Sequence, residues 1–278
     1  MNAPAAQAHW DRAGRTARNG IVGPAARAGL TARGVIHLIV GALALQIAFG
    51  DGHREADSSG AVAELAGKPF GEALLWALGA GLAGMAVWQL SEALFGAAGP
   101  DGRTARARLT SAARCVFYAA SAFSVLAFAA GSRSHGSRSS DRQSHDLTSR
   151  VLDLPAGQVL VGAAGAGIVV AGVWMGVQAV RRTYREQLRL AGMSRGARAL
   201  TDVTGVAGGV ARGVLFAGIG AFAVRAAVVH RPGEARGVDG TLRSFAGTPL
   251  GPWLLAAVAT GLVLFGVFSF LLARRRRV

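Results

Sequence analysis

The sequence predicts an all-α, polytopic membrane protein: six transmembrane helices, built as three tandem two-helix repeats around a pseudo-threefold axis. Two observations support this fold class. The apolar residues are gathered into blocks of membrane-spanning length, and a set of short landmarks recurs three times in the same order. The composition agrees, because 51% of the 278 residues are hydrophobic and only 16% are charged, which is a low charge content for a soluble domain.

The apolar blocks have the length that a membrane requires. A helix needs about 20 mostly apolar residues to cross the hydrocarbon core. A soluble helical bundle is the alternative, but its helices usually keep a polar face, and residues 159–177 and 250–272 have none. We therefore predict helices over Leu30–Phe49, Ala73–Leu94, Cys115–Gly131, Val159–Val180, Val206–Val229 and Leu250–Ala273.

The landmarks pair these helices into repeats. The first helix of each pair opens with Ala-Arg-Gly/Cys-Val, and the second follows a proline. Twelve residues after that proline stands a glycine, and nineteen residues after it a large aromatic side chain. The landmarks are Arg33, Arg114 and Arg212; Pro69, Pro155 and Pro249; Gly81, Gly167 and Gly261; and Trp88, Trp174 and Phe268. A repeat outweighs local signals, and two-helix units enter a membrane in the same orientation, which implies an axis along its normal.

The repeats divide the chain into seven segments. Residues 1–26 are predicted to form a disordered basic tail, without the apolar run of a signal peptide. Repeats cover 27–96, 109–180 and 203–273, basic linkers cover 97–108 and 181–202, and a basic tail covers 274–278.

The charges predict the topology. The tails and the loops on one side carry 17 basic and four acidic residues, whereas the loops on the other side carry nine of each. Excess Arg and Lys marks cytoplasmic loops, so we place both termini in the cytoplasm. The net charge of +15 then indicates attraction to anionic lipid rather than nucleic-acid binding.

Each first helix presents a cation, a ring and a small residue at i, i+4 and i+8, for example Arg33, His37 and Gly41. These positions share one helix face, and small residues let helices approach closely in lipid. The glycines expected to pack helices together are Gly41, Gly81, Gly167, Gly209, Gly213, Gly220 and Gly261.

Polar residues at membrane depth are the candidate site residues. One arginine near a helix end can extend its charge to the interface. Three at equivalent positions, Arg33, Arg114 and Arg212, could instead form a ring that binds lipid phosphate or another anion. Gln46 and Arg225 occupy equivalent places toward the outer ends of their helices and are candidates for an outer vestibule, although Arg225 could also simply reach the interface.

The loops before the prolines predict short interfacial helices. Asp146 or Asp239 could cap such a helix, a glycine such as Gly67 or Gly247 would end it, and the proline would open the next span.

Enzyme motifs are absent or misplaced. The glycines from Gly79 to Gly84 match a dinucleotide fingerprint as a string, but they lie inside an apolar span, whereas that motif needs a preceding strand. The lone Cys115 cannot form an intrachain disulfide or a cysteine metal cluster. We predict no catalytic residue, cofactor or metal site.

The three copies of Ala-Arg-Gly/Cys-Val and of proline followed by a glycine-rich helix resemble the bacterial domain-of-unknown-function 1206 family, over about residues 26–273. The middle copy departs, with Cys115 in place of glycine and Ala156-Gly157 after its proline. The resemblance implies a six-helix membrane architecture and carries no activity.

Two function classes remain open. The first is a non-enzymatic scaffold or a bundle that binds lipids, with anionic lipids as partners, or a protein. The second is a small transporter or channel with a pathway along the pseudo-threefold axis, which the parallel repeats and equivalent arginines would suit.

The charge distribution gives a first prediction. Reporter fusions after Gly52, Ser137 and Gly233 should report the outside of the cell, and fusions after Gly102 and Gly192 the cytoplasm, because translocation disfavours the basic loops. The reverse pattern at most of these sites would refute the topology.

Overall fold

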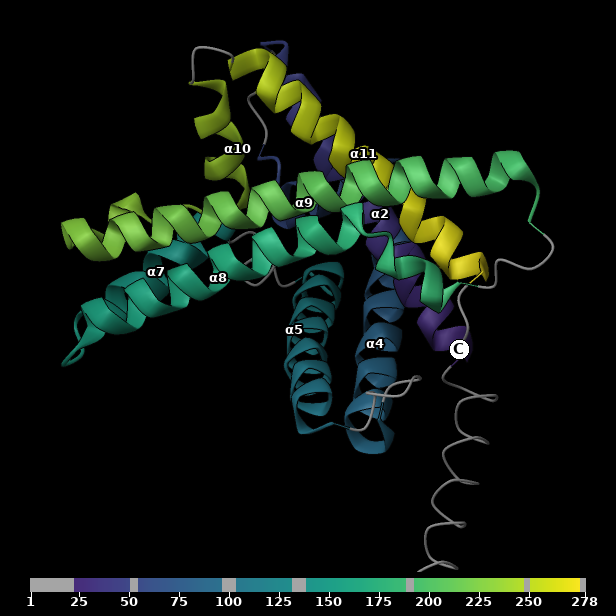
Figure 1. Ribbon diagram of the computed structural model, residues 1–278, viewed down its shortest axis with the longest axis horizontal. Coiled ribbons are helices and arrows are strands. Elements are labelled where there is room, and N and C mark those ends of the chain that lie inside the picture. The colour runs from purple at the N-terminus through teal and green to yellow at the C-terminus, as the bar shows by residue number, and fades with distance from the viewer. Residues whose placement is uncertain are drawn as a thin grey trace, which may run out of the picture.

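The computed structural model describes residues 23–50, 55–96, 104–131, 139–188, 193–247 and 251–275. Every regular element in this part of the chain is a helix, and six helices are long and apolar enough to span a membrane. They are α2 (Gly23–Ala48), α4 (Gly71–Phe95), α5 (Ala105–Ala129), α8 (Gly157–Val180), α9 (Arg195–Val229) and α11 (Gly251–Arg275) (Figure 1). The predicted all-α class with six membrane-length helices is confirmed. Residues 1–22, 97–103, 189–192 and 276–278, which carry most of the predicted tail and parts of both linkers, lie outside the described residues.

Three helices begin well before their apolar blocks. Helix α2 begins at Gly23 rather than Leu30, so residues 23–26 of the tail that was expected to be disordered are helical. Helix α5 begins at Ala105 rather than Cys115, and α9 at Arg195 rather than Val206. A hydroxyl caps the starts of α5 and α9, because Thr104 accepts a hydrogen bond from the Ala107 N–H and Ser194 accepts one from the Ala197 N–H. Such caps satisfy N–H groups that a helix start leaves unpaired. Parts of the segments expected as linkers, 97–108 and 181–202, are therefore helical.

The long helices pack in three pairs that each join two different repeats. Helix α4 packs on α5, α8 on α9, and α11 on α2. In Figure 1 these pairs run in three directions: α4 and α5 down the view, α8 and α9 across it, and α2 and α11 diagonally. Because the last repeat pairs back onto the first, the three repeats form a closed cyclic order.

Contacts at equivalent positions show that the pairs are built alike. A Cβ added to Gly41 would lie 2.9 Å from the Val263 nitrogen, and one added to Gly220 would lie 2.6 Å from the Val169 nitrogen. Val263 and Val169 each stand fourteen residues after the proline of their repeat. Backbones this close exclude any larger residue, which is how small residues drive helix association in lipid.

Within the repeats the packing is unequal. Helix α2 packs on α4 and α9 on α11, whereas α5 and α8 of the middle repeat are not a packed pair in the described part of the chain. The middle repeat therefore departs from the other two, although its two helices each keep a partner in a neighbouring repeat.

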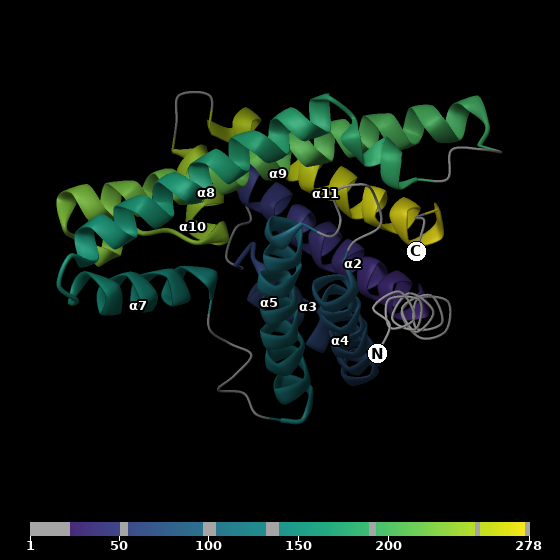
Figure 2. The same cartoon turned by 60° about the horizontal axis from the view of Figure 1, so that its bottom comes forward.

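One short helix precedes the second long helix of each repeat, as predicted from the loop sequences. These helices are α3 (Ser58–Ala66), α7 (Ser140–Leu152) and α10 (Val238–Ala246). We call these three helices the cap (Figure 2). The next long helix begins two residues after the proline rather than at it. The residue between, Phe70 or Ala156, has φ 63°, and a Cβ on Gly71 would lie 2.6 Å from the Ala66 oxygen. The Pro-x-Gly element is thus a tight turn that only glycine can complete.

The carboxylates of the cap link the three repeats. Asp57 accepts from the Ser140 N–H at 2.6 Å, Asp141 from the Gly237 N–H at 2.6 Å, and Asp239 from the Ala56 N–H at 2.7 Å. Each bond therefore joins the start of one short helix to another repeat, in a cycle. The prediction that Asp146 or Asp239 caps its own short helix was wrong. Asp239 accepts from the Ala56 N–H of the first repeat, and Asp146 lies exposed within α7. The helix starts of α3 and α7 are capped by Asp57 and Ser139.

This cycle gives a second prediction. Asp57 is fully buried and also accepts from the Gly60 N–H, so Asp57→Ala should lower the free energy of unfolding by about 1–3 kcal/mol, the cost of leaving buried donors unpaired. Thermal unfolding in detergent micelles measures it. Asp146→Ala is the matched control and should change stability by less than about 0.5 kcal/mol; equal effects of the two variants would contradict the cycle.

Candidate anion-binding site

The structure gathers the three landmark arginines. Arg33 on α2, Arg114 on α5 and Arg212 on α9 are close enough to one another for electrostatic repulsion, and Arg33 and Arg212 also interact with Tyr118 of α5. Arg33 and Arg212 are partly buried and Arg114 is exposed. The electrostatic neighbours of Arg33 and Arg212 among the described residues include no carboxylate. We call these three residues the arginine cluster.

One aromatic ring joins two members of the cluster. The Arg33 guanidinium carbon lies 5.1 Å from the centroid of the Phe265 ring, and the Arg212 carbon lies 4.9 Å from it. His37 packs against the same ring at 4.9 Å between centroids. Cation–π contacts contribute about 0.5–2 kcal/mol each, which orients the guanidiniums but leaves their charge uncompensated.

Hydrogen bonding differs among the arginines at equivalent places. The Arg33 Nε donates to the Ser269 hydroxyl at 3.3 Å, and that hydroxyl donates to the Phe265 carbonyl. Ser269 stands twenty residues after its proline, and the same position in the middle repeat is Met175. Met175 offers only a weak thioether acceptor, and the Arg212 Nε is buried without a hydrogen-bond partner in the described structure.

The first repeat has Gln89 at this position. Gln89 is buried, and its Oε1 also lacks a partner among the described residues. Buried polar atoms without partners are rare in folded proteins and call for an explanation. A ligand that accepts from Arg212 and neutralises the cluster would explain the unpaired Arg212 Nε, whereas the Gln89 Oε1 is an acceptor and would need a donor.

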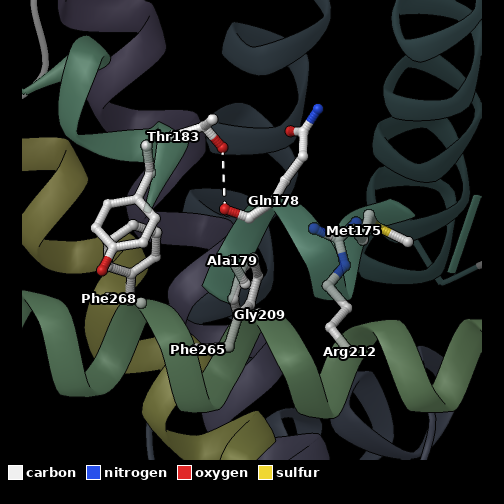
Figure 3. Close-up of a pocket in the computed structure, with 10 residues that line it drawn as sticks. Met175, Gln178, Ala179, Thr183, Gly209, Arg212, Phe265 and Phe268 are labelled. Atoms are coloured by element: carbon white, nitrogen blue, oxygen red, sulfur yellow. Dashed lines mark hydrogen bonds between the residues drawn. The ribbon is translucent and has the colours of Figure 1, made fainter. Parts of the chain in front are cut away.

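A pocket lies against Arg212. Its volume is about 390 Å³, and it is formed by α8, α9, α11 and the 3-10 helix η2 (Thr183–Gln187). In Figure 3 the Arg212 side chain rises from α9 beside Met175, and Phe265 lies between Arg212 and Phe268, which also line the pocket. The pocket thus places a cation next to aromatic and small residues.

An ion-pair network holds η2 over this pocket. The Arg185 Nε donates to Asp202 of α9 at 2.9 Å, the Tyr184 hydroxyl donates to the same carboxylate at 3.2 Å, and Arg182 lies 3.8 Å from it. Burial, together with the Asp202 charge, raises the pKa of Tyr184 to about 12. Tyr184 is therefore a neutral donor at physiological pH, and Asp202 is engaged here rather than with the arginine cluster.

The other predicted residues lie elsewhere. Gln46 and Arg225 are both exposed, and Arg225 pairs with Glu234 of η3 (Pro232–Glu234) at 3.1 Å. This pair ties α9 to the loop before the cap, which is a structural use of Arg225. The structure does not bring Gln46 and Arg225 to a common cavity among the described residues.

The predicted packing glycines fall into two groups. Most lie where a Cβ would meet a neighbouring helix: Gly41 and Val263, Gly81 and Ala32, Gly209 and Ala179, Gly213 and Gly172, Gly220 and Gly165, and Gly261 and Ala211. Gly167, in the middle repeat, has no atom within 4 Å of such a Cβ.

Comparison with known proteins agrees with the repeat. A family model described as Domain of Unknown Function (DUF1206) matches three times, at residues 28–96, 109–182 and 207–276. The chain belongs to the DUF1206 family. A DUF1206 relative, named "Uncharacterized protein YxxB" in Bacillus subtilis (strain 168), is 32% identical over 248 residues, which cover 88% of each chain. No solved structure matches the chain.

Two contributors to the site were missed from the DUF1206 sequence. Phe265 and Ser269 lie on the second helix of the third repeat, sixteen and twenty residues after the proline, whereas sequence reasoning looked for site residues on the first helices. An alignment of the second helices of the three repeats, counted from their prolines, would have pointed to Phe265 and Ser269. No group of three or more His, Cys, Asp or Glu side chains suited to a metal occurs in the described residues. The guanidinium groups of the arginine cluster are donors of the kind that bind anions in proteins.

The unpaired Arg212 Nε gives a third prediction. Met175→Gln, which copies the residue at this position in the first repeat, should raise the free energy of unfolding by about 1 kcal/mol, the net contribution of one hydrogen bond. Thermal unfolding in detergent without anionic lipid or phosphate measures it. Met175→Leu keeps the volume but adds no acceptor, so a Gln variant no more stable than the Leu variant would contradict this account.

Proposed function

We propose that this DUF1206 protein is a non-enzymatic, multi-pass protein of the bacterial plasma membrane that binds the phosphate of an anionic lipid at the arginine cluster. The observation that carries the proposal is the convergence of Arg33, Arg114 and Arg212 without a carboxylate among the neighbours of Arg33 and Arg212. The six membrane-length helices and the bacterial relative support the location.

Electrostatics favour a bound anion. Charged side chains within a membrane-spanning segment are costly and are usually paired, and three guanidiniums near one another add mutual repulsion. A phosphate diester accepts several charge-assisted hydrogen bonds, and arginine binds it in bidentate fashion. In the topology predicted from the charges, the cluster lies toward the cytoplasmic side, where anionic lipids attract basic residues.

The alternative, a small transporter or channel, has a weaker basis. The parallel repeats and the pocket of about 390 Å³ beside Arg212 would suit it. However, Asp57, Asp141 and Asp239 join the three cap helices to one another, so the cap ties the repeats together on the side opposite the arginine cluster.

The fourth prediction tests lipid binding. The triple variant Arg33→Gln, Arg114→Gln and Arg212→Gln should retain phosphatidylglycerol about tenfold more weakly or worse, because a hydrogen bond to a charged group contributes about 1.5–3 kcal/mol. Native mass spectrometry after lipid exchange in micelles counts the bound lipids. Each single Gln variant should still insert and fold, since the other two arginines and the helix contacts remain.

The matched control changes three exposed arginines outside the cluster, Arg106, Arg181 and Arg195, to Gln. It alters the net charge equally, so it reports general attraction to anionic head groups. Equal loss of lipid in the two triple variants, or undiminished retention in the cluster variant, would show that the cluster is not a lipid site.

A further inference from the structure

The gap between α5 and α8 leaves two complementary helix faces uncovered. In the first and third repeats the corresponding faces pack on each other: Gly81 meets Ala32, and Gly261 meets Ala211. The equivalent residues of the middle repeat are Ala113 and Gly167. Both faces are bare, because Ala113 is exposed and no atom lies within 4 Å of a Cβ on Gly167.

Two substitutions in the middle repeat explain the gap. A Cβ on Gly29 would lie 2.7 Å from Met85, and one on Gly208 would lie 2.6 Å from Phe265, so the close approach requires glycine at this position. The middle repeat has Thr110 there. It also has Leu109 where the other repeats have alanine, and Leu109 is 74% exposed.

The two faces that border the gap are apolar and lie in membrane-length helices. On α5 they include Leu109 and Phe117, and on α8 Val170 and Trp174, each more than half exposed. Arg114 projects from the same α5 segment and belongs to the arginine cluster. The two uncovered faces therefore combine apolar surface suited to a hydrocarbon chain with a cationic group suited to a charged head.

We propose that the gap between α5 and α8 is the cleft in which an anionic phospholipid lies, with its phosphate at the arginine cluster and an acyl chain between the two helix faces. This rests on the proposed function and adds the binding position and the lipid class. A free phosphate would satisfy the guanidiniums but would leave the apolar faces uncovered, whereas a diacyl lipid matches both. The two closed repeats hold the cluster together, and the open repeat gives the lipid lateral access to it.

Photoreactive lipids test the cleft in the full chain. Phosphatidylglycerol with a diazirine in one acyl chain is added to the protein in zwitterionic nanodiscs, illuminated, and mapped by peptide mass spectrometry, and phosphatidylcholine with the same chain serves as the comparison. The phosphatidylglycerol adducts at Phe117 and Trp174 should exceed those of phosphatidylcholine about tenfold, because both lipids carry a phosphate diester but the arginine cluster repels the choline cation of phosphatidylcholine. At Val87 and Leu94, exposed on α4, both lipids should react equally.

The outcomes separate the two proposals. Equal labelling of the α5 and α8 faces by both lipids, or an excess of phosphatidylglycerol on other helices, would overturn the cleft. If that happens while the triple Gln variant of the cluster still loses phosphatidylglycerol, the proposed function stands and only the position is wrong. If the triple variant keeps its lipid, the proposed function itself fails.

A second variant tests the cause of the gap. Thr110→Gly with Leu109→Ala restores the small residues of the other repeats, so α5 and α8 should close and the excess labelling by phosphatidylglycerol should fall about tenfold, to the phosphatidylcholine level. Val87→Gly with Leu94→Ala makes matched changes on α4 and should leave the excess unchanged. An excess that survives the closing variant would count against the cleft.

Discussion

The close approach of helix backbones between repeats is the constraint on which the rest of this structure depends. At Gly41, Gly213 and Gly220 a single added carbon would strike the facing helix. In lipid, apolar side chains gain nothing by leaving water, so tight van der Waals contact between small residues is what holds helices together. These contacts join the third repeat to the first and to the second, and Gly79 meets the Leu126 side chain between the first and second repeats. The same packing therefore brings Arg33, Arg114 and Arg212, which lie on these helices, close to one another.

The packing of the repeats thus brings three equivalent arginines close enough together to interact electrostatically. A single arginine at this depth could reach the interface, but three that converge repel one another. The residues twenty positions after each proline differ in the hydrogen bonds they offer. Ser269 accepts from the Arg33 Nε, whereas Met175 leaves the Arg212 Nε without a partner among the described residues. The arginines at equivalent positions therefore differ in their hydrogen bonding. In the proposed lipid site, the side of the cluster that faces Met175 is the one where a phosphate would accept from Arg212.

Much of this architecture follows from sequence patterns, because length, hydrophobicity and repeat spacing are local properties. The six spans, the three repeats and the short helices before Pro69, Pro155 and Pro249 are all of this kind. Contacts between repeats are not. The capping of Ala56 by Asp239 spans 183 residues of sequence, and nothing near Asp239 distinguishes it from a carboxylate that caps its own helix. Phe265 and Ser269 became site residues only through the packing of α11 on α2 and α9, which no local pattern encodes.

In the middle repeat, larger residues replace the small residues that let the two helices of the other repeats pack, and α5 and α8 are not a packed pair in the described part of the chain. Glycine at positions 29 and 208 permits contact with Met85 and Phe265, while Thr110 at the equivalent place carries a Cβ and a branch that the same geometry has no room for. The neighbouring interfaces, α4 with α5 and α8 with α9, do not depend on this position, so α5 and α8 keep their outer partners while separating from each other. In the lipid-binding proposal, the interface left open between α5 and α8 gives a lipid access to the arginine cluster. The pairings of α4 with α5, α8 with α9 and α11 with α2 keep the three arginines together at the same time.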